Sequence, residues 1–184
     1  MKFISIDVET TGLDSEWCQV LEIGAVAWEI GKGQIGKPFQ CLLKHEKIVG
    51  DPYALWMNRD LLRILADNPR ELVPPESVAC LFRDWRNSLD KVSLDFMGSK
   101  PFNAAGKNFA SFDAGFLKKL LGFFELNPWR RRILDPSILY VETGDKTLPD
   151  TATCLTRCGH DSTVAHMAVE DALTVCHLLE AKLA

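Results

Sequence analysis

Residues 3–13 read FISIDVETTGL and place two acidic residues inside an otherwise apolar segment. Apolar residues occupy every second position from Ile4 to Val8, and this period of two predicts a β-strand. Asp7 and Glu9 therefore point to the same face of the strand, about 7 Å apart along its axis. Two like charges this close on a buried sheet are costly unless a cation lies between them.

Two interpretations of this pair remain open from the segment alone. A divalent cation would neutralise the two carboxylates, and hard oxygen ligands favour Mg²⁺ or Mn²⁺. Alternatively, the strand ends at the rim of the sheet and both carboxylates are solvated. The rest of the chain has to distinguish between them.

Length and composition indicate one globular domain over residues 1–184, because 47% of the residues are hydrophobic and suffice for a sizeable core. No apolar run is long enough to span a bilayer and no signal peptide is visible, so we expect a cytoplasmic protein without membrane contact. The six cysteines are scattered, which is typical of reduced thiols. Cys154, Cys158 and His160 form a tight cluster, but a structural zinc site needs a fourth ligand and better spacing.

The charge balance argues against a protein that coats nucleic acid through a broad basic surface, because 21 basic and 25 acidic residues give a net charge of −4. It remains compatible with a protein that binds a short nucleic-acid end. Basic residues cluster at 118–119 and 130–132. Each run is either a solvated surface or a set of phosphate contacts.

Periodicity and turn residues predict an α/β fold without internal repeats. After the first strand, we expect strands at 20–30, 37–43, 102–105 and 133–134, with a glycine-rich hairpin turn at 31–36. We expect helices at 55–66, 76–89, 111–122 and 164–183, with Ser111 as the N-cap and Gly122 as the stop of the third. A hairpin meander followed by alternating helices and strands predicts a mixed five-stranded sheet with helices on both faces.

A third acidic residue, Asp113, lies early in its predicted helix beside an apolar stripe of Phe109, Phe112 and Phe116. A buried aspartate normally needs a partner, and this indicates a functional role for Asp113. The alternative is an N-terminal helix acid that the helix macrodipole stabilises.

The last predicted helix carries Glu170 and Asp171, which cannot both face the protein interior. We expect Asp171, five residues after His166, to be the one that faces inward. His166 taken alone is either structural or catalytic.

Together, IDVETTG, NFASFDAGFL and HMAVED resemble the three sequence motifs of the DEDD exonuclease superfamily, in the branch whose last motif carries a histidine (DEDDh). The resemblance runs from residue 3 to about residue 180. It implies a ribonuclease H-like fold and a metal-dependent 3′→5′ exonuclease that releases nucleoside 5′-monophosphates from the 3′ end of single-stranded DNA or RNA. It also implies two divalent ions, Mg²⁺ or Mn²⁺, held by Asp7, Glu9, Asp113 and Asp171, with His166 as the general base.

One feature departs from the histidine-branch pattern. Asn108 precedes Asp113 by five residues, where many members of this branch have an asparagine four residues before the aspartate. The spacing is more similar to that of the oligoribonuclease branch, which has a tyrosine in place of His166. The role of Asn108 and the subfamily therefore stay open.

Substrate contacts are expected directly after the metal strand. Backbone N–H groups of Thr10 and Thr11 are candidates to hold the terminal nucleotide, and Leu13 to wedge against its base. Phe112 is either a stacking residue or part of the core.

Two metal ions about 4 Å apart would activate water and stabilise the leaving oxygen, with Asp7 as the bridging ligand.

Two alternatives belong to other classes of protein. An inactive relative would serve as a nucleic-acid-binding or interaction module. An Asp-nucleophile phosphotransferase would use Asp7 as the nucleophile. That chemistry usually requires a D-x-D motif with a downstream lysine, and it leaves the positions of Asp113 and His166 unexplained. DNA or RNA preference, pathway and homodimer formation stay open.

Overall fold

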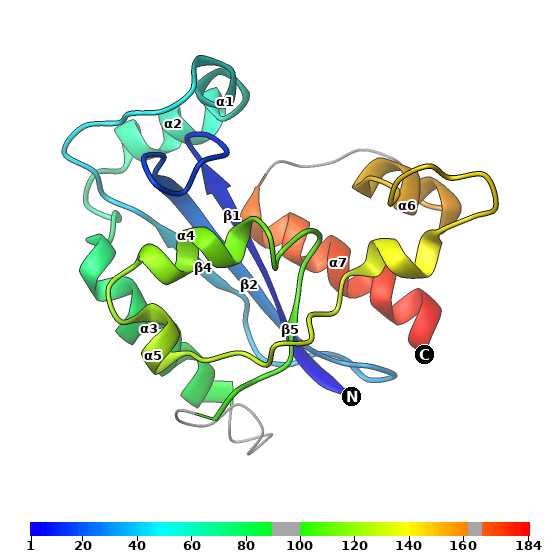
Figure 1. Ribbon diagram of the computed structural model, residues 1–184. Helices are drawn as coiled ribbons and strands as arrows, with labels where there is room; N and C mark the ends of the chain where they lie inside the picture. The colour runs from blue at the N-terminus through cyan, green and yellow to red at the C-terminus, as the bar shows by residue number, and fades with distance from the viewer. Residues whose placement is uncertain (90–99, 162–166) are drawn as a thin grey trace.

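The computed structural model describes residues 1–89, 100–161 and 167–184 (Figure 1). Its centre is a mixed sheet in which β1 and β2 form a long antiparallel pair. The short strands β3 and β4 both pair antiparallel with β2, and β5 pairs parallel with β1. The five strands are β1 Lys2–Thr10, β2 Val20–Glu29, β3 Gly33–Gln34, β4 Phe39–Leu42 and β5 Ala104–Ala105.

Helices cover both faces of this sheet, as the sequence predicts (Figure 1). α7 packs on one face of β1 and β2, whereas α3, α4 and α5 pack on the other. Among the described residues, no helix is both long enough and apolar enough to cross a bilayer. The helices are α1 Pro52–Met57, α2 Arg59–Asp67, α3 Pro75–Ser88, α4 Asp113–Lys119, α5 Phe123–Leu126, the 3₁₀ helix η3 Pro136–Tyr140, α6 Thr151–Arg157 and α7 Ala168–Leu183.

The alternation in β1 divides its side chains between two cores, because successive residues of a strand point to opposite faces. Ile4, Ile6 and Val8 are buried in the larger core under α3, α4 and α5. Phe3 is buried in the smaller core under α7. Asp7 and Glu9 share the face of Phe3, so the strand presents them on the side that α7 covers.

The fifth strand is not where the sequence predicted it. Leu134 forms only an isolated bridge with Ala105, and the strand expected at 133–134 is therefore wrong. Pro136 follows after Asp135 and begins a 3₁₀ helix. Proline lacks the N–H that a longer strand ladder would need. The sheet still has five strands, because β3 forms inside the segment that was expected to be only a hairpin turn.

Two predicted helices have different boundaries in the structure. The helix expected at 55–66 is divided into α1 and α2 at Asn58, whose buried side chain donates from Nδ2 to the Thr10 carbonyl (2.9 Å). The helix expected at 111–122 runs only from Asp113 to Lys119. Ser111 is not its N-cap, because the Ser111 hydroxyl bonds Asn108 instead. Residues 90–99 and 162–166, including His166 and the first residues of the predicted last helix, lie outside the described part of the chain.

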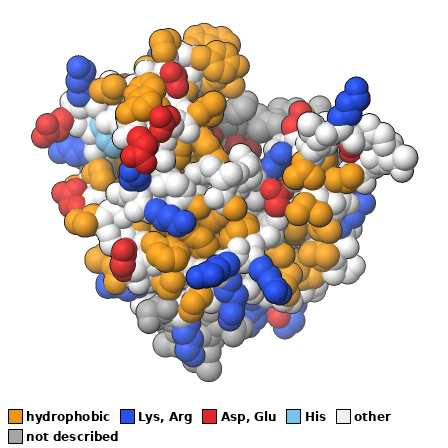
Figure 2. All heavy atoms as spheres, in the orientation of Figure 1, with side chains coloured by type: hydrophobic (Ala, Val, Ile, Leu, Met, Phe, Trp, Pro, Cys, Tyr) orange, Lys and Arg blue, Asp and Glu red, His pale blue; other side chains and the backbone are white. Residues whose placement is uncertain are grey.

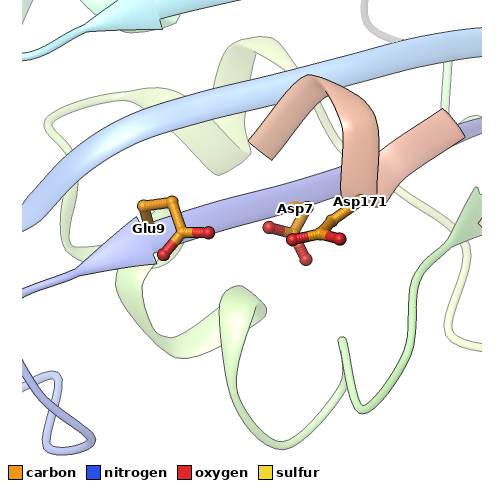
Figure 3. Close-up of side chains that lie close together, drawn as sticks. All are labelled: Asp7, Glu9 and Asp171. Atoms are coloured by element: carbon orange, nitrogen blue, oxygen red, sulfur yellow. The ribbon is translucent and has the colours of Figure 1, made fainter. Parts of the chain in front are cut away.

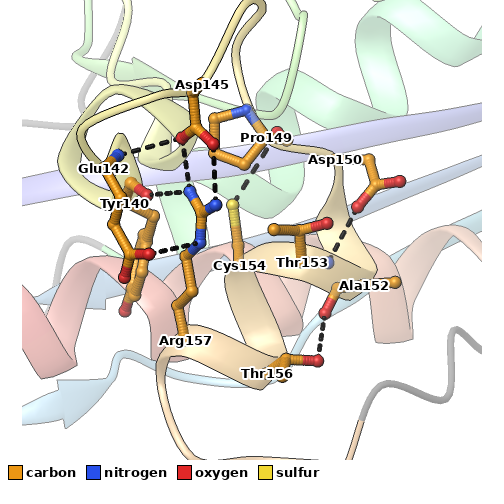
Figure 4. Close-up of polar contacts among 10 residues, drawn as sticks. All are labelled: Tyr140, Glu142, Asp145, Pro149, Asp150, Ala152, Thr153, Cys154, Thr156 and Arg157. Atoms are coloured by element: carbon orange, nitrogen blue, oxygen red, sulfur yellow. Dashed lines mark hydrogen bonds and ion pairs between the residues drawn. The ribbon is translucent and has the colours of Figure 1, made fainter.

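η3 and α6, which the sequence did not predict, form a unit that Arg157 holds together (Figure 4). Its guanidinium donates to both carboxylate oxygens of Asp145 (2.6 and 2.8 Å) and to the Tyr140 carbonyl (2.7 Å). The Tyr140 hydroxyl in turn donates to the Leu178 carbonyl of α7 (2.9 Å). The unit is thereby attached to the helix that carries Asp171.

The N-terminus of α7 lies directly against β2 at Gly24, the cross-strand partner of Asp7. A Cβ atom at this position would lie 2.2 Å from the backbone carbon of Ala168. A glycine is therefore required for the first turn of α7 to approach the sheet beside Asp7.

We expect Gly24→Ala to destabilise the protein by about 1–3 kcal/mol, because the added methyl group meets backbone atoms that cannot rotate away. Chemical denaturation measures the change. Gly115→Ala in α4 is the matched control: its Cβ would meet only the Ser15 side chain at 3.2 Å, and helical alanine should offset this contact. Equal stability of the Gly24→Ala and wild-type proteins would contradict the close approach.

Candidate active site

Asp7, Glu9 and Asp171 converge where β1 runs past the first turn of α7 (Figure 3). One carboxylate oxygen from each of the three lies within 4.8 Å of those from the other two. Asp7 and Glu9 share a face because they are two residues apart in a strand. Asp171 joins them because α7 packs on this face, and Glu170 is exposed, as the sequence predicted for this pair.

Asp113 approaches the same region from the opposite side of β1. Its carboxylate is almost completely buried and accepts the Val8 backbone N–H (3.1 Å). This N–H lies beyond the end of β5, which pairs only with Ile4 and Ser5. Asp113 therefore occupies the strand edge that β5 leaves open, close to the carboxylate trio without being part of it.

These acidic groups hold protons strongly in the absence of a cation. Burial, followed by the charges of Asp113 and Asp171, raises the pKa of Asp7 well above its usual range. Burial and the charge of Asp171 raise the pKa of Glu9 to about 7. Burial raises the pKa of Asp113 to about 7 as well, although the hydrogen bond from Val8 opposes the shift.

The chemistry of this donor set fits a divalent metal ion. In the described part of the chain, no lysine or arginine forms a salt bridge with Asp7, Glu9 or Asp113. Desolvated carboxylates without a cation from the protein are stabilised by a bound one. Carboxylate oxygens that converge within a few ångströms are the ligands that Mg²⁺ and Mn²⁺ prefer.

Glu22 is a buried carboxylate near the site that sequence reasoning missed. It lies opposite Glu9 on β2 and is fully buried. Its carboxylate accepts the Ala168 N–H (3.1 Å) and the Gln40 side-chain amide (2.6 Å). The first N–H groups of a helix have no partner within the helix, so Glu22 satisfies one and fixes the turn that carries Asp171. A charged residue inside the apolar stretch 20–28 was the available signal.

A cavity of about 650 Å³ adjoins the carboxylates, between the turn after β1 and the helix α1. Leu13 lines it with 81% of its surface exposed, and the half-buried Phe112 lies on the α4 side. Glu9 lines the same cavity, which places an apolar pocket directly beside a carboxylate of the trio. Its remaining lining residues include Thr10, Asp51, Tyr53, Met57 and Asn58.

Thr11 does not line this cavity. It is fully buried, its N–H donates to the Gln19 carbonyl (2.9 Å), and its hydroxyl accepts the Gln19 N–H (2.8 Å). Its N–H already has a partner within the protein, and the contact with a nucleotide expected of Thr11 stays a prediction. Thr11 fixes the turn that presents Leu13.

Asn108 has a left-handed backbone, with φ 58°, which asparagine tolerates better than most residues. Its N–H donates to the Asp135 carboxylate (2.9 Å), and its side-chain oxygen accepts from Ser111. Asn108 thus shapes the loop before α4. It also lines a second hollow that contains Asp7.

No family model and no curated protein sequence matches this chain. Solved structures of Exonuclease I do resemble it. A structure of that enzyme described as suggesting how processivity is achieved covers 98% of this chain, with a TM-score of 0.70 and 14% identity. A zinc-bound complex of the E. coli enzyme with single-stranded DNA covers 98%, with a TM-score of 0.70 and 15% identity. Its complex with a 5cy-dT13 oligonucleotide covers 98%, with a TM-score of 0.68 and 13% identity.

This chain spans 40% of the length of each of these three neighbours. At such low identities, the similarity shows the fold alone. The chain has the α/β fold of these Exonuclease I structures, and the predicted ribonuclease H-like fold class is confirmed. Membership of the DEDD superfamily and of its histidine branch stays a prediction.

The raised pKa values of Glu9 and Asp113 predict how stability changes with pH in the metal-free protein. Below about pH 4, both groups are protonated in the folded and the unfolded chain. Between about pH 4 and 7, the folded chain binds more protons, so its stability falls as pH rises and the contribution is lost above about pH 7.

We therefore expect the melting temperature in EDTA to fall between pH 5 and 8, and Glu9→Gln to reduce this fall. Glu125→Gln, at an exposed acid on α5, is the control. Mn²⁺ should raise the melting temperature of the wild-type protein at pH 8, because it binds the folded carboxylates. A melting temperature that rises steadily from pH 5 to 8 in EDTA would oppose this electrostatic explanation.

Proposed function

We propose that this chain is a metal-dependent 3′→5′ exonuclease that hydrolyses single-stranded nucleic acid and releases nucleoside 5′-monophosphates. The observation that carries the proposal is the convergence of three carboxylates, those of Asp7, Glu9 and Asp171, beside an apolar cavity of about 650 Å³. Cavities of roughly 300–1,000 Å³ are typical of small-ligand sites. In this proposal, residues 1–184 form one exonuclease domain.

Asp7, Glu9, Asp113 and Asp171 would hold the metal ions, which we propose to be two Mg²⁺ or Mn²⁺. When bound, such ions neutralise the phosphate, activate water and stabilise the leaving 3′-oxygen. The charges of Asp113 and of Asp171 both act on Asp7, which makes it the candidate bridging ligand. Glu22 has a different role: its hydrogen bond to the first turn of α7 orients Asp171.

The cavity beside Glu9 would hold the terminal nucleotide. Leu13 and Phe112 supply apolar contacts on one side, and Tyr53 and Met57 of α1 supply them on the other. Bases bind such surfaces by stacking, without strong sequence preference. A terminal nucleotide must leave its stack to enter the cavity, so single strands and frayed ends should be better substrates than internal duplex.

Single-stranded DNA is the first substrate to test, because the Exonuclease I neighbours are described in complexes with dT13 and dA16 oligonucleotides. An inactive nucleic-acid-binding module of the same fold is the alternative. The presence of all four acids, Asp7, Glu9, Asp113 and Asp171, favours the enzyme. A binding module would not need to bury like charges together.

We expect the wild-type protein with Mn²⁺ to shorten a 5′-labelled linear oligothymidine and to release dTMP. Asp7→Asn should reduce hydrolysis by at least about 10³-fold, because it removes the proposed bridging charge while keeping the shape of the side chain. Asp67→Asn, at an exposed position at the end of α2, should leave the rate unchanged. Denaturing electrophoresis of the products measures both rates.

A circular single strand of the same sequence should resist cleavage, since it has no 3′ end to enter the cavity. Comparable cleavage of circular and linear strands would exclude an exonuclease. Undiminished hydrolysis by Asp7→Asn would exclude this metal site.

A separate prediction concerns His166. If it is the general base, His166→Ala should lower kcat by roughly 10²–10⁴-fold with little change in KM. The acidic limb of the pH–rate profile should change in this variant, because the imidazole titrates near neutral pH. His160→Ala, at an exposed histidine, is the control. A His166→Ala variant that loses binding but keeps its turnover would support a structural histidine.

A further inference from the structure

Three shallow hollows follow one another across the surface from Asp7. The first, of about 340 Å³, contains Asp7, Lys107 and Asn108. The second, of about 370 Å³, shares Asn108 and continues to Arg131. The third, of about 580 Å³, shares Arg131 and is bounded by Arg130 and Arg132. Each hollow shares a lining residue with the next, so the three hollows are neighbours along the surface.

We call Lys107, Arg130, Arg131 and Arg132 the basic track. The three arginines are exposed, and within the described ranges their side chains form no salt bridge or hydrogen bond with the protein. Adjacent guanidinium groups repel one another, so this arrangement favours a bound polyanion. Figure 2 shows Lys and Arg side chains gathered across the lower middle of this face.

The acids along the track are already used by the protein. Asp135 accepts the N–H groups of Asn108 and Ser137 (both 2.9 Å). Asp150 accepts the Thr153 N–H at the start of α6 (2.8 Å). These carboxylates stabilise local backbone turns, and the arginines remain available to an external anion.

The arginine row is built on a fixed backbone. The Arg130 N–H donates to the Phe102 carbonyl (2.8 Å), and the Leu134 N–H donates to the Ala104 carbonyl (3.0 Å). Trp129, which precedes the three arginines, is buried and forms an isolated β-bridge with Phe102. The segment 130–134 is therefore attached at both ends to the backbone of residues 102–104, at the β5 edge of the sheet.

The apolar cavity and the first hollow share Leu13 and Phe112, and Glu9 lines the cavity while Asp7 lines the hollow. These two carboxylates therefore lie where the cavity adjoins the track. We propose that the basic track binds the phosphates of the strand upstream of the scissile bond, while the terminal nucleotide occupies the cavity. This inference rests on the proposed function. It gives the strand a direction: from the cavity, past Asp7 and Lys107, to the three arginines.

The test compares the triple variant Arg130→Gln/Arg131→Gln/Arg132→Gln with the control triple Lys32→Gln/Arg63→Gln/Arg70→Gln, which removes the same charge from exposed positions elsewhere. Binding of fluorescent dT2 and dT12 is measured by anisotropy in EDTA, where no hydrolysis occurs. KM for the same oligonucleotides is measured with Mn²⁺.

For the track variant, we expect KM for dT12 to rise roughly tenfold and KM for dT2 to change less than about twofold. The slope of log K against log salt for dT12 should decrease in magnitude by about 0.7 for each phosphate that the variant no longer neutralises. The control triple should behave like the wild-type protein on both oligonucleotides.

Equally weakened binding of dT12 in the two triple variants would overturn the track, because only total charge would then matter. Equally weakened binding of dT2 and dT12 in the track variant would also overturn it, since the arginines would then act at the terminal nucleotide. If the wild-type protein hydrolyses neither oligonucleotide, the proposed function fails, and the anisotropy comparison still decides whether the arginines bind the strand.

Discussion

Mutual repulsion among the carboxylates on the α7 side of β1 is the constraint on which the rest of the structure depends. Asp7, Glu9 and Asp171 are brought within ligand distance of one another, with Asp113 at the edge of the strand that β5 leaves open. Such a group stays together only if packing elsewhere forces it, or if a cation neutralises it. The structure supplies the packing, and the proposed metal ions would supply the charge.

The packing has two components, and both act on the first turn of α7. Gly24 lets the helix backbone approach the sheet beside Asp7. Glu22 accepts the N–H of Ala168 and fixes the direction in which the helix leaves the sheet. On the other edge, β5 ends early and Asp113 accepts the backbone N–H of Val8. The acidic residues thus converge because of backbone contacts with ordinary structural roles.

Local patterns predicted most of the architecture, because the two-residue period of β1 and the spacing of α3 depend on nearby residues alone. Asp7, Glu9, Asp113 and Asp171 could be proposed as site residues because an acid in an apolar context is visible in the sequence. The pairing of β3 and of the segment around Leu134 was harder to predict from the sequence. β3 pairs through only two residues, and Leu134 through a single bridge, so neither leaves a periodic signal. Glu22 and Thr11 have roles set by partners far away or across a turn, which local patterns do not encode.

Calorimetric titration of the EDTA-treated protein with Mn²⁺ at pH 8 tests most directly whether these carboxylates together hold divalent ions. We expect two ions to bind to each wild-type chain. We also expect no measurable binding in Asp7→Asn, because Asp7 is the proposed bridging ligand and the charges of both Asp113 and Asp171 act on it. Wild-type binding no stronger than that of an Asp7→Asn/Glu9→Gln/Asp171→Asn variant would contradict the claim.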